Sequence, residues 1–180
     1  MPLKYHLHFA SRIAKVSRVA RRRKAKHRSG CPVSISLEIL GDRWSLLIIR
    51  DLMVRGFRSF RDFERAGEGI ATNVLADRLR WLRRAGIVKT EAEKGDRRRV
   101  NYRLTSKGID LAPVLFDLLV WGAEHEKTGA PREVIRRMAR NREAVLAETR
   151  RRWQHRDLTP LLPWLGGPRE AARRSRSRNR

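Results

Sequence analysis

Residues 70–86, IATNVLADRLRWLRRAG, carry the pattern that decides the fold. At 100° per residue of an α-helix, Leu75, Leu79 and Leu82 fall on one side. The opposite stripe consists of Asn73, Asp77, Arg80 and Arg84, flanked by Ala76 and Arg83. One face suits a protein core. The other suits the major groove of DNA, where short polar groups contact base edges and cations contact phosphates, although a merely solvated face would show the same stripe.

The residues before this stretch predict a helix-turn-helix. Ser59, followed by Phe-Arg-Asp-Phe-Glu, is typical of an N-cap that opens a short helix ending near Ala66. Gly67-Glu68-Gly69 then predicts a turn between helices rather than a phosphate loop, because no Gly-Lys-Ser/Thr follows. Residues 32–41 and 42–56 predict two earlier helices, the second apolar over much more than one stripe and therefore largely buried.

The residues after Gly86 change period and predict a hairpin. Residues 87–93 and 100–105 are β-prone and flank KGDRRR at 94–99, which is typical of a glycine turn with a cationic tip. The three arginines of this tip are Arg97, Arg98 and Arg99. As a wing beside a helix-turn-helix, they would bind phosphates in a salt-dependent, non-specific way. A solvated loop is an alternative explanation of the three arginines. It accounts less well for a hairpin that directly follows a helix, a turn and a second helix.

A helix expected to start at Thr105 is apolar almost all the way round, so one side of it needs a partner. A homodimer across this helix is the economical explanation. Burial under the chain's own later helix, expected to begin near Pro131, is the alternative. The residues expected at the dimer interface on this helix are Leu111, Leu115, Leu118, Leu119 and Trp121.

The charge predicts an anionic polymer as partner. The chain of 180 residues has 43 Lys and Arg against 19 Asp and Glu, a formal charge of +24. Residues 1–30 carry +10 and residues 166–180 carry +5, so the part between them is also basic. We expect a basic disordered arm at 1–30, a DNA-binding and dimerisation domain at 31–126, a helical extension at 127–165 and a basic disordered tail at 166–180.

Several classes of protein find little support in the sequence. One cysteine, Cys31, excludes an intrachain disulfide and fits a reducing compartment. No stretch approaches the ~20 apolar residues of a membrane span, and no metal-ligand spacing, cofactor motif or paired catalytic carboxylate is evident. We therefore expect neither an enzyme nor a membrane partner, no metal and no cofactor. An organellar transit peptide would also suit the Arg-rich N-terminus, but a cytoplasmic protein is the preferred interpretation.

An ordered series of motifs resembles the HxlR-type winged helix-turn-helix transcriptional regulators. The motifs are CPV (31–33), LGDRWSLLIIRDL (40–52), RSFRDF (58–63), GIATNVLADRL (69–79), AGIV (85–88), YRLTSKG (102–108) and WG (121–122). The resemblance implies a mainly α, homodimeric, usually bacterial DNA-binding protein. It implies a recognition helix at 71–85, a wing at about 87–104 and dimer contacts through the helix after the wing and the first helix, which contains Ile35.

Some proteins of this family sense oxidants through a cysteine at the position of Cys31. A thiol at a helix N-terminus, near Lys24, Lys26 and Arg28, favours the thiolate, although an ordinary cysteine is the default interpretation. Many relatives carry Ser or Arg/Lys near the start of the recognition helix, where this chain has Ala71 and Asn73. The target sequence therefore cannot be transferred from them.

These observations predict a sequence-specific regulator, more plausibly a repressor, that binds double-stranded DNA at a palindromic operator. Thr72 and Asn73 are the expected base contacts. Arg80, Arg83 and Arg84 are expected at phosphates. Asp77 could accept a hydrogen bond from a cytosine amine, but beside phosphates it is expected to orient Arg80 or Arg84. Arg78 leans towards the core side and could instead form an ion pair. The alternative is a non-specific architectural or RNA-associated protein driven by the charge of the tails; the operator, the genes and the effector cannot be read from the sequence.

Overall fold

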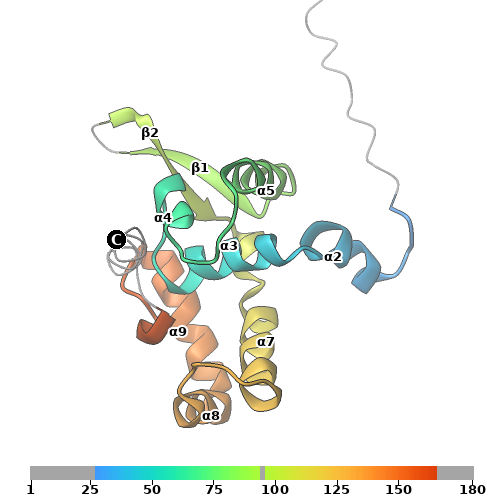
Figure 1. Cartoon of the computed structure of the whole chain (residues 1–180), viewed down its shortest axis with the longest axis vertical. Helices are drawn as coiled ribbons and strands as arrows, with labels where there is room; N and C mark the ends of the chain where they lie inside the picture. The colour runs from blue at the N-terminus through green and yellow to red at the C-terminus, as the bar shows by residue number, and fades with distance from the viewer. Residues whose placement is uncertain (1–26, 94–95, 166–180) are drawn as a thin grey trace, which may run out of the picture. The chain divides into compact units, whose positions relative to one another are not determined.

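A computed structural model describes residues 27–93 and 96–165, and contacts divide the chain into two units, 1–35 and 36–180. The helices are α2 (Pro32–Leu40), α3 (Arg43–Val54), α4 (Phe60–Glu64), α5 (Thr72–Arg84), α6 (Ser106–Ile109), α7 (Ala112–His125), α8 (Arg132–Arg140) and α9 (Arg142–His155), with a 3₁₀ turn at Pro163–Leu165. The strands are β1 (Val88–Glu93) and β2 (Asp96–Leu104), which pair antiparallel. The predicted class, mainly α with one hairpin, is confirmed (Figure 1).

The core of the larger unit forms around α3. Its inner residues Ile48, Ile49 and Leu52 are buried, as the apolar pattern of this helix predicts. α4, α5 and the hairpin cover α3 on one side, and α7 and α9 lie on the other (Figure 1). The buried cluster comprises Ile48, Ile49, Leu52, Phe57, Phe63, Leu75, Leu79, Leu82, Ile87, Val88, Leu104 and Ile109. A single hydrophobic cluster therefore joins the helix-turn-helix to the hairpin.

The predicted helix boundaries rest on side-chain caps. Asp42 accepts hydrogen bonds from the backbone N–H of Ser45 at 2.9 Å and from its hydroxyl at 2.6 Å, which fixes the start of α3. Ser59 and Asp62 form a capping box at the start of α4. Gly86 ends α5 with φ +71°, a conformation that favours glycine.

Three expected elements differ in the structure. The helix expected from Thr105 is broken into α6 and α7, because Pro113 has no N–H to donate and its ring would clash with the carbonyl four residues earlier in a continuous helix. The later helix is interrupted at Asn141, whose φ of −114° and ψ of 36° leave the α region. Strand β2 begins at Asp96, so the tip arginines belong to the strand and not to the turn.

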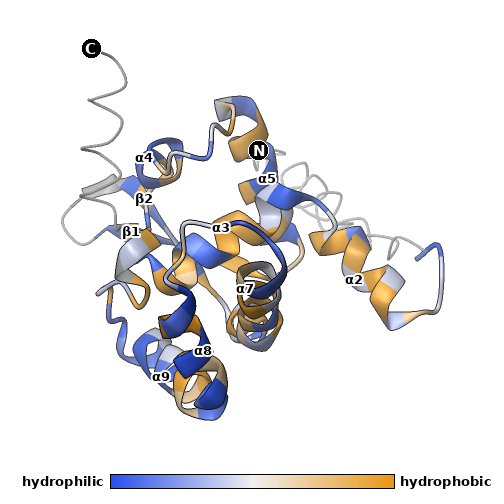
Figure 2. Cartoon of the chain, turned by 60° about the horizontal axis from the view of Figure 1, so that its bottom comes forward, coloured by the Kyte–Doolittle hydropathy of each residue, from blue (hydrophilic) through white to orange (hydrophobic). Residues whose placement is uncertain are grey.

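Residues 158–162 pack against the C-terminal end of α3. The N–H of Leu161 donates to the carbonyl of Val54 at 2.8 Å, and Leu162 is buried. Gly56, with φ +73°, faces Leu158 so closely that a Cβ would lie 2.1 Å from its carbonyl oxygen, so only glycine allows this approach. α3 and α7 are largely hydrophobic, whereas α9 is mainly hydrophilic (Figure 2). No helix among the described residues could span a membrane.

Candidate nucleic-acid interface

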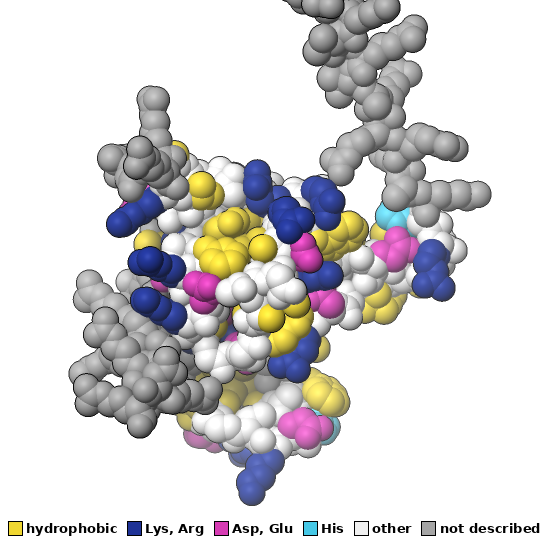
Figure 3. Space-filling model, turned by 45° about the horizontal axis from the view of Figure 1, so that its top comes forward, with side chains coloured by type: hydrophobic (Ala, Val, Ile, Leu, Met, Phe, Trp, Pro, Cys, Tyr) yellow, Lys and Arg dark blue, Asp and Glu magenta, His cyan; other side chains and the backbone are white. Residues whose placement is uncertain are grey.

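The two faces of α5 separate as the sequence predicts. Leu75, Leu79 and Leu82 are buried in the core cluster. The other face is exposed at Thr72, Asn73, Asp77, Arg80, Arg83 and Arg84, and Ala76 is half-buried beside them. Cationic side chains gather over this helix in the space-filling view (Figure 3). The helix thus presents a polar surface that no other described element covers.

The N-terminal end of α5 leaves backbone donors available. Its N-cap is Ala71, which has no side-chain acceptor, and no capping hydrogen bond is formed. The first N–H groups of an α-helix have no partner within the helix. Exposed N–H groups at a helix N-terminus attract phosphate oxygens. This end therefore combines the amide of Asn73, the hydroxyl of Thr72 and backbone donors on one exposed turn.

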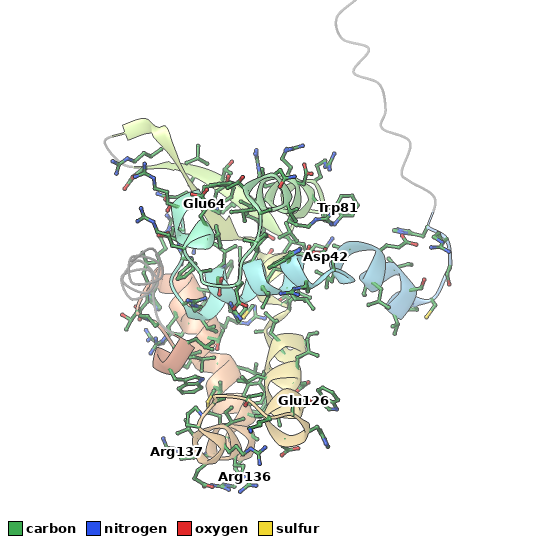
Figure 4. The ribbon with its side chains drawn as sticks, in the orientation of Figure 1. Asp42, Glu64, Trp81, Glu126, Arg136 and Arg137 are labelled. Carbon is green, nitrogen blue, oxygen red and sulfur yellow. The ribbon has the colours of Figure 1, made fainter. Side chains whose placement is uncertain are left out.

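Two contacts fix the orientation of α5 against the start of α3. The indole Nε1 of Trp81 donates to the carbonyl of Ile39 at 3.0 Å, and Arg78 pairs with Asp42 at 3.3 Å. Trp81 and Asp42 lie on the same side of the unit (Figure 4). Partial burial would raise the pKa of Asp42, but the hydrogen bonds from Ser45 and the charge of Arg78 hold it below its ordinary value. Arg78 thus pairs inward, the alternative left open by the sequence.

A buried ion cluster anchors the turn before α5. Arg50 Nη2 lies 2.7 Å from Asp51 Oδ1 and 2.9 Å from Glu68 Oε1, and Arg55 Nη1 lies 3.2 Å from Asp51 Oδ1. Arg55 also donates to the carbonyl of Ala66 at 3.4 Å. Burial raises the pKa of Asp51 although both guanidiniums oppose it. The cluster connects α3 and its C-cap to Ala66 and Glu68, in the segment that leads into α5.

Sequence reasoning missed this cluster. Its signal was present, because Arg50 and Asp51 interrupt an otherwise apolar run in a helix expected to be buried. Charged residues are rarely fully buried unless they are paired. A charged pair in such a helix therefore indicates a partner elsewhere, but the pattern does not reveal that the partner is Glu68.

The arginines of α5 differ in their partners. Arg80 pairs with Asp77 at 2.7 Å, one of the arrangements that the sequence leaves open for Asp77. Arg84 lies over the ring of Trp81, with its guanidinium carbon 5.6 Å from the ring centroid. Within the described part of the chain, no carboxylate forms an ion pair with Arg83 or Arg84. Their charge is therefore available to an external anion.

The hairpin lies beside α5 and is tied to α4. The N–H of Tyr102 donates to the carbonyl of Arg58 at 2.7 Å, and the ring of Tyr102 packs edge-on against Phe63. Arg99 is exposed and lies 3.8 Å from Glu93. The side chains of Arg97 and Arg98 lie outside the described residues. The wing prediction for its tip thus remains open, whereas the position of the hairpin is confirmed.

The residues expected at a dimer interface fall into two groups. Leu118 and Trp121 are 48% and 56% exposed, and Val114, on the same face of α7, is 47% exposed. Leu111 and Leu115 instead pack against the core cluster. Two further residues, Leu119 and Ile35, are half-buried. The exposed apolar face of α7 is therefore narrower than the sequence suggests.

Cys31 is exposed and lies immediately before α2. Its backbone N–H donates to the hydroxyl of Ser29 at 3.0 Å. Lys24 and Lys26, which the sequence places near it, lie outside the described residues. No group of three or more potential metal ligands is found among the residues that the structure describes.

Comparison with known proteins agrees with this geometry. The profile of the family described as HxlR-like helix-turn-helix matches residues 39–130, just over half of the chain. The chain is 32% identical over 97 residues to the uncharacterised HTH-type transcriptional regulator YdeP of Bacillus subtilis, which covers 54% of this chain and 75% of that protein. It is 38% identical over 96 residues to the uncharacterised HTH-type transcriptional regulator Rv3095 of Mycobacterium tuberculosis, which covers 53% of this chain and 60% of that protein.

A solved structure shows the same fold. PA1607, a proposed transcription factor, superposes with a TM-score of 0.52 at 35% identity and covers 57% of this chain and 70% of its own. The matched part of this chain contains α3, the helix-turn-helix, the hairpin and α7, so family membership rests on the elements that build the exposed face of α5. The chain belongs to the HxlR-like helix-turn-helix family of transcriptional regulators.

Proposed function

We propose that this protein is a sequence-specific repressor that acts by occupying a promoter rather than by catalysis, as a homodimer on a palindromic operator. The observation that carries the proposal is the exposed outer face of α5. This face joins an amide, backbone donors without a side-chain cap and two arginines that have no carboxylate partner in the part of the chain that the structure describes. A helix of this kind fits the major groove. Such a regulator must reach the chromosome, and we therefore expect it in the cytoplasm.

The roles divide along α5. Asn73 is the leading base contact, since its amide can bind adenine in a bidentate way, and Thr72 assists it. Arg83 and Arg84 bind phosphates, and Arg80 is oriented by Asp77. The wing arginines, Arg97 to Arg99, add affinity that depends on salt and not on sequence.

The homodimer is supported by the apolar face of α7. Val114, Leu118 and Trp121 are each about half exposed and recur at helical spacing. A two-fold dimer would match the two half-sites of a palindrome. Trp121→Glu should convert the dimer to a monomer in analytical ultracentrifugation, whereas Ala144→Glu, on the exposed part of α9, should leave it unchanged. A wild-type chain that sediments as a monomer at micromolar concentration would exclude this assembly.

One experiment distinguishes sequence-specific regulation from the rival function, which is non-specific nucleic-acid binding by the charged tails. The full chain and a form without residues 1–30 and 166–180 are titrated against the chain's own promoter fragment and a random duplex at physiological salt. We expect both forms to prefer the promoter fragment. A shortened form without preference for the promoter fragment would favour the architectural or RNA-associated alternative.

Oxidant sensing by Cys31 stays a prediction. The thiol is exposed, so reagents can reach it. Cys31→Ser should abolish any loss of DNA binding that diamide causes in the wild-type protein. An unchanged response would show that Cys31 is not the sensor.

A further inference from the structure

An apolar cavity of about 250 Å³, partly open to solvent, lies in the larger unit between α3 and the helices α7, α8 and α9. α3 contributes Met53 to its wall, α7 contributes Phe116, and α8 and α9 contribute Met138 and Val145. Leu118, which is half exposed, also belongs to the wall. The part of the wall that α8 and α9 contribute lies wholly beyond residue 130, where the match to the family profile ends.

The polar atoms of the wall have partners already. The Thr149 hydroxyl donates to the carbonyl of Val145 at 2.8 Å. The Arg50 guanidinium is paired with Asp51 and with Glu68. Neither group is left to form a hydrogen bond with a molecule in the cavity. A charged or strongly polar occupant would therefore lose its hydration and gain no hydrogen bonds in exchange. The wall therefore selects an uncharged, largely apolar molecule.

The cavity is too large to be ordinary packing imperfection. Native interiors hold few voids larger than a water molecule, and apolar cavities are not stabilised by water, which needs polar partners. An apolar cavity of about 150 Å³ is already large enough for a benzene-sized molecule. The chain's own C-terminal tail is a poor occupant, because residues 166–180 contain no large hydrophobic residue.

We propose that this cavity is an effector site for a small, uncharged, largely apolar molecule, such as a compound with two fused or linked aromatic rings. Methionine walls suit such a ligand, since flexible thioethers adapt to irregular shapes. The effector role, though not the binding itself, rests on the proposed function.

A physical route connects the site to DNA. Arg50 lines the cavity on one side and holds Glu68, in the turn before α5, on the other. An occupant that shifts Arg50 or the neighbouring turn of α3 changes the support of the recognition helix. Binding that favours one position of α5 must alter DNA affinity by the same factor as DNA alters ligand affinity.

The site is tested with N-phenyl-1-naphthylamine, an uncharged dye whose fluorescence rises in apolar surroundings, titrated into the full-length protein. We expect saturable binding with one site per chain. Val145→Phe, which fills the cavity, should weaken binding at least ten-fold, and Ala147→Phe, which adds the same ring on the exposed side of α9, should not. Circular dichroism checks folding; if Val145→Phe does not fold, Met138→Phe fills the cavity from α8 instead.

Three results would overturn the site: no saturable binding, equal affinity in the filled variants and the wild type, or dye binding that falls as protein concentration rises, which would mean that a second copy occupies the cavity. The effector role is tested by titrating promoter DNA with and without the dye. We expect at least a three-fold change in the Kd for DNA in the wild type and none in Val145→Phe. An unchanged Kd overturns the effector role alone. Failure to prefer promoter DNA without dye overturns the proposed function and with it the effector role, but it leaves the binding site untouched.

Discussion

Two helices of this chain are rich in arginine, but they differ in how many of these arginines are paired with carboxylates. α9 carries Arg142, Arg150, Arg151 and Arg152, and each pairs with a carboxylate of the chain at 3.1 Å or less. On α5, Arg78 and Arg80 are also paired, but Arg83 and Arg84 have no carboxylate partner within the described residues. The same residue type therefore serves two purposes, internal neutralisation on α9 and an available positive surface on α5.

The comparison teaches that arginine content alone does not locate a nucleic-acid interface. Exposed ion pairs contribute only about 0–1 kcal/mol each, so the pairs of α9 matter chiefly because they cancel local charge. Arg150 pairs with Asp110, which follows α6, and Arg142 pairs with Asp117 of α7, so both help to attach α9 to the earlier helices. The formal charge of +24 does not distinguish these two situations.

The largest expected effect concerns the inner faces of the two helices. Leu75 of α5 is fully buried in the core cluster, so Leu75→Ala should lower the free energy of unfolding by about 3 kcal/mol. Leu146 of α9 is half-buried against the apolar cavity, and Leu146→Ala should cost about 1 kcal/mol, because less contact is lost. Urea unfolding followed by circular dichroism measures both. Equal losses would show that α9 is as firmly packed as α5.

The next effect concerns sequence reading. Asn73→Ala should weaken binding to the operator by about 2 kcal/mol and leave binding to a random duplex unchanged, because only a base contact is lost. Gln154→Ala, which removes an exposed amide from α9, is the matched control and should change neither. Fluorescence anisotropy measures both affinities. If the two duplexes are affected alike, Asn73 does not read bases.

A smaller effect separates available from neutralised charge. Arg83→Ala combined with Arg84→Ala should reduce the slope of log affinity against log salt by about 2, because two phosphate contacts are lost. Arg150→Ala combined with Arg151→Ala removes the same formal charge and should leave the slope unchanged. Anisotropy titrations between about 50 and 200 mM salt provide the slopes, because the affinity of a protein with several phosphate contacts falls steeply over this range. Identical changes in both double variants would refute the distinction between the helices.

The smallest effect is a pH dependence on α9. Hydrogen bonds from Arg151 and Arg152 lower the pKa of Glu148 from 4.5 to about 2. A carboxyl whose pKa is lowered in the folded state stabilises it above pH 4.5, and this contribution is lost as the pH falls towards 2. Glu148→Gln should therefore show a shallower fall of Tm between pH 4.5 and 2 than the wild type. Glu124→Gln, at an exposed position of α7, should follow the wild-type curve; if Glu148→Gln follows it too, these hydrogen bonds do not stabilise the fold.

Local signals made much of the fold predictable. The caps at Asp42 and Ser59 and the glycine at Gly86 act on neighbouring backbone, so their positions follow from residues a few places apart. The leucines of α5 obey a helical period, and the face opposite them is exposed as expected. The break between α6 and α7 also had a local signal, Pro113, which the continuous apolar pattern obscured.

Long-range pairing could not be predicted in the same way. Glu68 is 18 residues from Arg50 and Asp110 is 40 residues from Arg150, and only the folded chain brings these pairs together. For that reason, the sequence indicates which arginines face outward on α5 but not which of them lack a carboxylate. The division of the expected dimer residues has the same origin, because Leu111 and Leu115 are covered by the chain's own core.

The central claim, that the outer face of α5 and not of α9 meets DNA, is tested most directly by placing a DNA-cleaving reagent on each helix. Cys31 is the only cysteine, so Cys31→Ser allows a single thiol to be introduced by Asp77→Cys on α5 or by Ala147→Cys on α9. An iron–EDTA reagent is attached to that thiol, and the protein is saturated with promoter DNA. We expect cleavage within each operator half-site from position 77 and only background cleavage from position 147. Cleavage from position 147 with none from position 77 would contradict the account.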